Sequence, residues 1–376
     1  MKKLFALLLA LAMVLSLAAC GGSKKEEPKQ EETTTEESAA AFKLGGTGPL
    51  TGGAAIYGNA AKNGAQIAVD EINAMGGIQF ELKYEDDQHD AEKAVNAYNA
   101  LKDWGIQISL GSVTSKPCEA TSAEAYADRI FSLTPSASST AVTEGKDNTF
   151  QMCFMDPNQG SASAQYISDK ALGSKIGVIY DTSDPYSAGL YEAFEAQMTA
   201  LNKVKDTDYF VYTFTKETNK DFSTQVSELK AKGCDVLFLP FYYTEAALVC
   251  KKAAQLDFNV PVFGCDGLDG IKDQLDDTVT AVISYITPFD VTSADVKDFV
   301  DAFQKKYGEA PNQFAADGYD AVMIIYEAMK AANVNDVTIS ASDLADAIRP
   351  ILTGGTFKYD GLTGKGMSWT TAGSCE

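Results

Sequence analysis

The sequence predicts an α/β protein with two doubly wound, Rossmann-like lobes. From residue 42 onward, short apolar runs alternate with longer amphipathic runs, and the alternation restarts near residues 157–175. Strands that alternate with helices of this length indicate parallel sheets covered by helices on both faces. An apolar content of 45% is ordinary for globular chains and suffices for sizeable cores. No fixed-period repeat is visible, which argues against a solenoid.

The first half opens with a strand at 42–48 that runs into a glycine-rich turn. A helix is expected at 59–75, because apolar residues fall at i, i+3, i+4 and i+7 on one face: Ala65, Ala68, Val69 and Ile72. Gly76 and Gly77 end this helix, as glycine past a helix end commonly does. Further strands are expected at 80–84, 106–110 and 130–133, and further helices at 91–104 and 115–128.

The second half repeats the alternation. Strands are expected at 175–181, 209–214, 235–239, 260–263 and 280–286, and helices at 187–201, 222–232, 245–256, 294–307 and 316–332. Ligands of such sheets bind beyond the carboxyl ends of the strands. Two facing lobes therefore predict a site in the cleft between them, where hinge closure can bury a small molecule.

The N-terminal segment is expected to direct and tether the chain. Residues 1–19 combine two lysines, an apolar run and small residues before Cys20, which is typical of an export signal. The run is shorter than the roughly 20 residues of a spanning helix, although a short membrane anchor is the alternative. Leu-Ala-Ala-Cys at 17–20 resembles a bacterial lipobox, in which the cysteine is diacylated and two lipid chains anchor stably. Residues 20–41 lack aromatics and large aliphatics, so we expect a flexible, lipidated tether.

Composition excludes several function classes. The 52 acidic residues exceed the 31 basic ones, for a net charge of −21, which argues against nucleic-acid binding. His89 is the only histidine, so a multi-histidine metal site is excluded. Sequence motifs for a nucleophile elbow, a zinc protease and a P-loop are absent, which leaves an exported hydrolase or oxidoreductase a weak alternative. We therefore expect neither an enzyme nor a bound cofactor or metal.

Six cysteines remain after Cys20. An exported protein can oxidise them, and no C-x-x-C pair indicates a zinc ribbon or a thioredoxin-like site. The spacing leaves disulfides and small buried thiols equally open. The six are Cys118, Cys153, Cys234, Cys250, Cys265 and Cys375.

The glycine-rich segment at 45–52 is expected to be a tight turn. It resembles a dinucleotide fingerprint, but Thr51 stands where the third glycine belongs. Pro49 also removes an N–H donor from the loop.

Two hydroxyl-rich loops follow neighbouring strands of the first half. Residues 111–115 open a helix with Ser115, and residues 134–140 follow the next strand. Hydroxyls at a helix start are commonly N-caps, and that alternative stays open. The same geometry offers an anion free N–H groups and a favourable helix dipole. Two such loops at adjacent strand ends can converge on one carboxylate with neutral donors, which fits a chain with only two arginines.

Polar residues also follow strands of the second half. Asp266 lies in a turn just past the strand at 260–263, where a carboxylate can pair with a ligand ammonium; a capping or turn aspartate is the alternative. Tyr186 and Tyr242 can close over a ligand with ring and hydroxyl. His89 has acidic neighbours and is expected to be a solvated strand-end histidine.

Several segments resemble the type I periplasmic binding proteins of branched-chain amino acid ABC transporters, the leucine/isoleucine/valine-binding group. The matching stretches are G-P-L-T-G at 48–52, Y-G-N-A-A-K-N-G-A at 57–65, A-V-D-E-I-N-A-M-G-G-I at 68–78, Y-E-D-D at 84–87, D-F-S at 221–223 and D-G-Y-D-A-V at 317–322. The resemblance runs from residue 42 to near the C-terminus. It implies two lobes joined by a three-segment hinge: 42–156 plus 288–352, and 157–287 plus 353–376.

The resemblance also implies site residues. Ser115 and Ser138 match hydroxyl donors to the α-carboxylate, assisted by the backbone around Ser136 and Ala137. Asp266 stands where the family places an acid for the α-ammonium, one methylene shorter than the glutamate expected in leucine-binding members. The remaining implied ligand-binding residues are Tyr57, Thr114, Tyr186, Tyr242 and Phe314.

One departure from the family concerns a disulfide. Thr114 stands where one of its cysteines would be, and no cysteine lies near residues 88–89, so we expect that bridge to be absent.

The implied function is binding without chemistry. We expect a monomeric, exported protein, lipid-anchored through Cys20 on the outer face of the membrane. It would present an amino acid, branched-chain or another small neutral one, to an ABC permease and its ATPase. The alternative is a sensor domain for an amino acid or small amide that feeds a signalling receptor.

Overall fold

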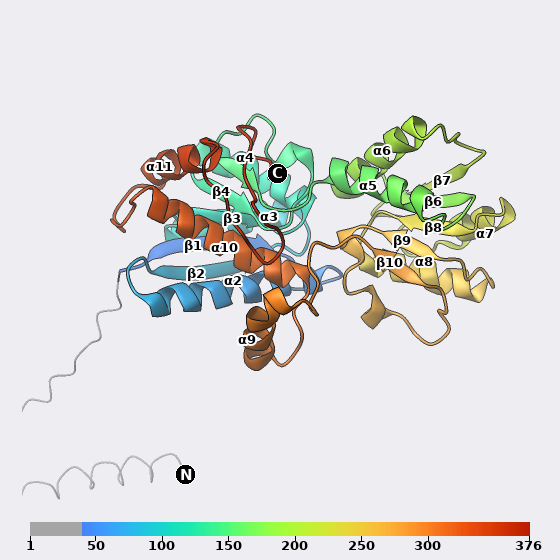
Figure 1. The fold of residues 1–376 in the computed structure, drawn as a ribbon, viewed down its shortest axis with the longest axis horizontal. Coiled ribbons are helices and arrows are strands. Elements are labelled where there is room, and N and C mark those ends of the chain that lie inside the picture. Colours follow the sequence, from blue (N-terminus) through green and yellow to red (C-terminus); the bar gives the residue numbers. More distant parts are fainter. Residues whose placement is uncertain (1–39) are drawn as a thin grey trace, which may run out of the picture. The chain divides into compact units, whose positions relative to one another are not determined.

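The computed structural model describes residues 40–376, which form two five-stranded β-sheets flanked by helices (Figure 1). The strand orders are β2-β1-β3-β4-β5 and β10-β9-β8-β6-β7, and every pair within them is parallel. We call each sheet with its helices a lobe. The predicted fold of two doubly wound lobes is confirmed. The predicted signal peptide and Cys20 lie outside the described residues.

The first lobe contains the N-terminal strands and helices. Its strands are β1 (Phe42–Gly48), β2 (Phe80–Asp86), β3 (Ile108–Ser112), β4 (Phe131–Thr134) and β5 (Thr149–Gln151). Helices α2 (Ala55–Met75), α3 (Ala91–Trp104) and α4 (Ser115–Asp128) connect them. Successive strand residues face opposite sides of a sheet. Accordingly, Phe42 and Leu44 pack in one core with α2, whereas the backbone of Gly45 lies against Leu101 of α3.

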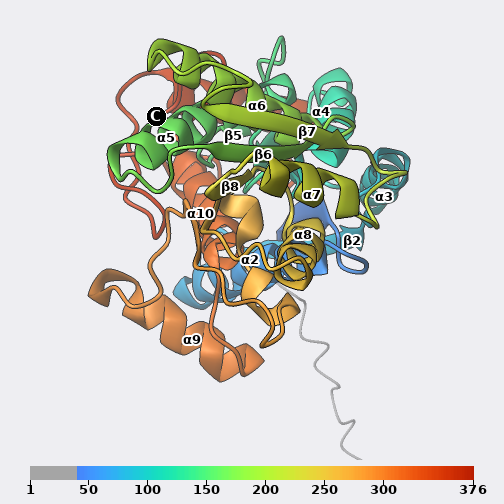
Figure 2. The same ribbon diagram turned by 90° about the vertical axis from the view of Figure 1, so that its right-hand side faces the viewer.

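The second lobe repeats this plan with β6 (Ile176–Asp181), β7 (Tyr209–Phe214), β8 (Val236–Leu239), β9 (Val262–Gly264) and β10 (Ile283–Tyr285). Its helices are α5 (Asp156–Asp169), α6 (Pro185–Ala200), α7 (Ser223–Ala231) and α8 (Tyr243–Gln255). Strand β8 is apolar throughout because both of its faces are covered. Val236 and Phe238 pack with α5 and α6, and Leu237 and Leu239 pack with α7 and α8. The two pairs of helices lie on opposite faces of the sheet (Figure 2).

The chain then returns to the first lobe. Helices α9 (Lys297–Tyr307), α10 (Gln313–Ala331) and α11 (Ala341–Thr353) follow β10. Helix α10 lies beside α2 (Figure 1), and the two cross so closely that a Cβ on Gly64 would lie 1.8 Å from the carbonyl oxygen of Ala315. A Cβ on Gly318 would lie 2.1 Å from the carbonyl oxygen of Ala61. Glycine at both positions is what permits this contact.

The C-terminal tail departs from expectation. Residues 353–376 were expected on the second lobe, but their contacts are with the first. Trp369 Nε1 donates to the Gln151 carbonyl of β5 at 2.9 Å, and Gln151 N donates to the Gly373 carbonyl at 2.9 Å. Met367 and Trp369 are buried in the core of the first lobe, and their burial explains why the tail remains there.

Three elements were not anticipated: β5, α5 and α11. The other helices and strands fall within a few residues of the expected ranges, and α3 and α4 match them at both ends. Short 3₁₀ helices occur at Thr140–Val142, Asp266–Leu268, Ile271–Gln274 and Ala294–Val296.

All six cysteines of the described chain are free thiols, which answers the question left open by their spacing. Five are buried, and Cys375 is partly exposed. Among residues 40–376, no helix combines the length and apolarity needed to cross a membrane.

Candidate ligand-binding site between the lobes

A small cavity between the lobes brings together eight of the ten ligand-binding residues expected from the resemblance. They are Thr114, Ser115, Ser136, Ser138, Tyr186, Tyr242, Asp266 and Phe314. Val113 and Gly267 complete the lining and were not anticipated. Tyr57 lies directly behind Phe314, with ring centroids 4.5 Å apart. Ala137 is buried, and its N–H donates to Thr134 Oγ1 at 3.1 Å, so this group is engaged elsewhere.

The first lobe contributes hydroxyls from two adjacent strand ends. Ser115 is the first residue of α4 and follows β3, and Ser138 follows β4. Ser115 Oγ accepts hydrogen bonds from the N–H groups of Ser138 and Ser139, both at 3.2 Å. These contacts hold the two loops against one another. The positive end of the α4 dipole and the hydroxyls therefore face the cavity together, which favours a negatively charged group.

The second lobe contributes an acid. Asp266 is 7% exposed and lies at the end of β9. Tyr186 Oη donates to its Oδ1 at 2.6 Å and accepts from the Gly267 N–H at 2.8 Å. The Asp266 N–H donates to Gln159 Oε1 at 3.2 Å. Burial raises the pKa of the Asp266 carboxyl to about 6, and the hydrogen bond from Tyr186 limits this rise.

Aromatic rings from both lobes surround the cavity. Tyr57 of α2 reaches across the cleft: its Oη donates to the Gly267 carbonyl at 2.6 Å and accepts from the Tyr243 N–H at 3.1 Å. Tyr186 and Tyr242 stack with centroids 4.9 Å apart and planes inclined by 15°. The hydroxyl of Tyr242 is buried without a hydrogen-bond partner among the described residues. It is therefore free to bond a molecule in the cavity.

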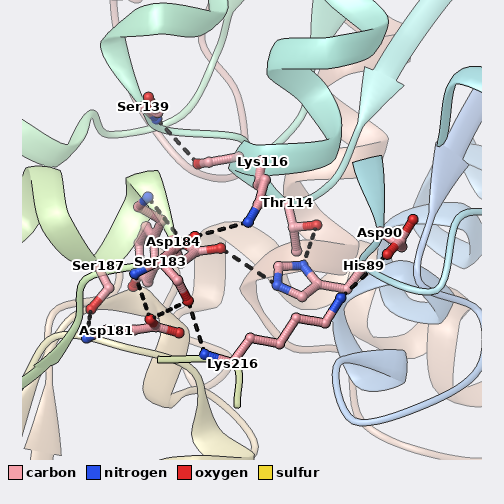
Figure 3. Close-up of polar contacts among 12 residues, drawn as sticks. His89, Asp90, Thr114, Lys116, Ser139, Asp181, Ser183, Asp184, Ser187 and Lys216 are labelled. Atoms are coloured by element: carbon pink, nitrogen blue, oxygen red, sulfur yellow. Dashed lines mark hydrogen bonds and ion pairs between the residues drawn. The ribbon is translucent and has the colours of Figure 1, made fainter. Parts of the chain in front are cut away.

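Polar contacts join the lobes at the mouth of the site (Figure 3). His89 of the first lobe lies between Thr114 Oγ1, 2.9 Å from its Nδ1, and Asp184 Oδ2 of the second lobe, 3.5 Å from its Nε2. Lys116 Nζ donates to the Ser183 carbonyl at 2.9 Å. His89 is thus not the solvated strand-end residue expected from its acidic neighbours. Its partners lie far away in the sequence, so local composition could not reveal them.

Two further contacts extend this boundary. Lys216 Nζ lies 3.3 Å from Asp90 Oδ2, and Thr244 Oγ1 donates to the Gly53 carbonyl at 2.6 Å. The same residues line a wider cleft that is open to solvent and shares Tyr242 with the small cavity. Contacts between the lobes therefore border the small cavity on this side.

The described residues offer no site for a metal ion. Within 40–376, no group of three or more His, Cys, Asp or Glu side chains has a suitable arrangement. The groups around the cavity can hold a small zwitterion, with hydroxyls and a helix start on one side and a carboxylate on the other.

Known proteins resemble this chain over most of its length. The model of the family described as "Periplasmic binding protein" matches residues 41–374. The chain belongs to this family. It is 30% identical over 310 residues to the Leu/Ile/Val-binding protein BraC3 of Rhizobium johnstonii, covering 81% of this chain and 83% of the relative. It is 29% identical over 323 residues to Leu/Ile/Val-binding protein homolog 3 of Brucella melitensis, covering 84% and 86%.

Solved structures of this family share the fold. The branched-chain amino acid transporter substrate-binding protein LivJ of Streptococcus pneumoniae, in complex with isoleucine, superposes with a TM-score of 0.77 at 28% identity, covering 89% of this chain and 93% of that one. The leucine-binding protein LivK of Thermotoga maritima gives a TM-score of 0.76 at 25% identity, with the same coverage. The protein is therefore a type I periplasmic binding protein of the branched-chain amino acid group, a substrate-binding protein and not an enzyme.

Proposed function

We propose that this periplasmic binding protein binds a small neutral amino acid between its lobes. Branched-chain amino acids are the first candidates. The observation that carries this proposal is the convergence of hydroxyls, one carboxylate and aromatic walls on one cavity. Ser115, Ser138 and the start of α4 receive the α-carboxylate. Asp266 receives the α-ammonium. The binding of isoleucine by LivJ and the names of the Leu/Ile/Val-binding relatives support an aliphatic side chain, which would pack against Val113 and Phe314.

Binding is coupled to hinge closure. The interlobe contacts at the mouth must open to admit the ligand and re-form around it. A ligand drives closure only to the extent that it binds the closed form more tightly. Here the acid and the hydroxyls come from different lobes, so both ends of a zwitterion are held only when the lobes meet. The closed form is then presented to an ABC permease and its ATPase.

We also propose that the exported protein is held at the membrane through a diacylated Cys20. The lipobox-like sequence at 17–20 supports this anchor, and residues 21–41 supply the tether. Cys20→Ser should abolish the incorporation of labelled fatty acid into the protein. Unchanged labelling would contradict the anchor.

Calorimetric titration of the purified protein, refolded to remove bound ligand, tests the amino-acid assignment. Leucine, isoleucine or valine should bind with a negative heat-capacity change, since apolar surface is buried. Ser115→Ala should weaken binding about tenfold or more, because a hydrogen bond to a charged group contributes about 1.5–3 kcal/mol. Ser122→Ala is a matched control, since this buried α4 hydroxyl bonds only the Glu119 carbonyl. Failure of all neutral amino acids at millimolar concentration would overturn the proposal.

A further inference from the structure

A second small cavity lies on the hinge side of Asp266. Its wall comes from the segments that connect the lobes, between β5 and α5 and after β10, together with Asp266 and the first turns of α5 and α10. Its lining comprises Cys153, Phe154, Gln159, Asp266, Ile286, Pro288, Gln313 and Asp317. Asp266 also lines the proposed ligand cavity, so this residue borders both cavities.

The polar side chains of this cavity are two carboxyl groups, two amides and a thiol. Both polar atoms of the Gln159 amide have partners, because its Nε2 donates to the Phe154 carbonyl at 2.7 Å and its Oε1 accepts from the Asp266 N–H at 3.2 Å. Gln313 is 1% exposed, and its Oε1 has no hydrogen-bond partner among the described residues. Asp317 is 3% exposed, and no hydrogen bond or ion pair joins its carboxyl group to another side chain in residues 40–376. No lysine, arginine or histidine lines the cavity.

Such an arrangement is unfavourable without a donor. Buried acceptors lose their hydrogen bonds to water and must be paired to recover the loss. Burial raises the pKa of the Asp317 carboxyl well above its usual range, and the neighbouring Asp320, Asp266 and Asp269 raise it further. Two acidic groups and one amide oxygen thus converge on a space that would suit a single N–H-bearing group.

We propose that the hinge-side cavity is a subsite for a second N–H donor of the ligand, a side-chain amine or carboxamide. This inference rests on the proposed function, because it requires an amino acid held with its ammonium at Asp266. A side chain that passes the Asp266 carboxyl enters the cavity and meets Asp317 and Gln313. The protein should therefore bind an amino acid with such a group more tightly than the aliphatic amino acid of the same shape.

Titration with two isosteric pairs provides the test. Asparagine is compared with leucine, and 2,4-diaminobutyrate with norvaline. We expect at least one polar member to bind ten times more tightly than its aliphatic partner. Preference for asparagine alone indicates a neutral carboxamide subsite, and preference for diaminobutyrate indicates charge pairing with Asp317; either supports the proposal. Equal or tighter binding of both aliphatic members overturns the subsite while leaving the proposed function intact. Failure of all four, and of isoleucine and valine, overturns both.

Variants of the cavity residues test whether the preference for a polar side chain arises in this cavity. Gln313→Leu and Asp317→Leu should abolish it without weakening leucine binding. Asp317→Asn keeps the size of the side chain and covers the case in which Asp317→Leu does not fold; it should abolish the preference for an amine and retain that for an amide. Glu327→Gln removes an acid from the outer part of α10 and should change nothing, since Glu327 pairs only with Lys330. A preference that survives both cavity variants contradicts the proposal.

Discussion

Asp266 has opposing effects on binding and on stability. Its ionised form is needed to pair with a ligand ammonium, yet burial raises its pKa from 3.8 to about 6 in the unliganded fold. The folded state therefore binds the proton more tightly than the unfolded state. The contribution of this group to the free energy of unfolding is fully present below pH 3.8 and is lost as pH rises through about 6. At neutral pH the loss is about 3 kcal/mol, since one pKa unit corresponds to about 1.4 kcal/mol.

We predict that Asp266→Asn stabilises the unliganded protein while it impairs binding. Asparagine keeps an oxygen to accept from Tyr186 but carries no charge to bury. Thermal unfolding at pH 7.5 should show a higher midpoint for the variant, and the difference should shrink towards pH 4. Affinity for a neutral amino acid should fall tenfold or more. A midpoint difference that does not depend on pH would show that the Asp266 charge does not limit stability.

The sequence could place some of the site residues but not others. Ser115, Ser138 and Asp266 follow strands, so topology alone brings them to the cleft. Gln313 and Asp317 lie inside a helix, where nothing local distinguishes a cavity-facing polar residue from a solvated one. His89 was misjudged for a similar reason: its partner Asp184 lies on the other lobe.

At the scale of the element, the crossing of helices α2 and α10 positions two aromatic rings at the ligand cavity. Helix α2 carries Tyr57, and α10 carries Phe314.

Gly64→Ala should separate helices α2 and α10, because the added Cβ would overlap the Ala315 carbonyl. We expect a loss of about 1–3 kcal/mol or more in stability, measured by urea unfolding, together with weaker binding. Lys62→Ala, at an exposed position of α2, should change stability by less than about 0.5 kcal/mol. Equal stability of the two variants would contradict the close crossing.

Most helices with a strong apolar period were predictable, whereas α5 and β5 offer no such period. Helix α5 buries Gly160, Ser163 and Ala164, and Gly160 lies against the backbone of α6. Its sequence therefore has no apolar stripe. Strand β5 has only three residues, too few for a periodic signal. Helix α11 did offer a signal, since Ser340 accepts from the Asp343 N–H as an N-cap, but Pro350 lies inside it and obscures the pattern.

At the scale of the whole molecule, the two lobes meet through titratable groups. His89 is surrounded by Asp87 and Thr114 of its own lobe and by Asp184 and Glu245 of the other. Burial lowers the pKa of His89, but the acids, led by Asp184, raise it more, so the net pKa lies above 6.5. When the lobes part, His89 should lose Asp184 and Glu245 together with part of its burial. Because the acids outweigh burial in the closed form, we expect its pKa to fall on opening, so that closure takes up a proton.

Ligand affinity should therefore depend on pH through His89. Closure is favoured while His89 is protonated, so affinity should fall as pH rises above 6.5, tenfold for each unit by which its pKa differs between closed and open forms. Asp266 stays ionised over this range because its pKa is about 6. Asp184→Asn should flatten the profile measured by calorimetry. Lys216→Gln is the matched control: it removes an interlobe ion pair with Asp90, so it should lower affinity at every pH and leave the slope unchanged. A flat wild-type profile, or an unchanged slope in Asp184→Asn, would contradict the coupling of this proton to closure.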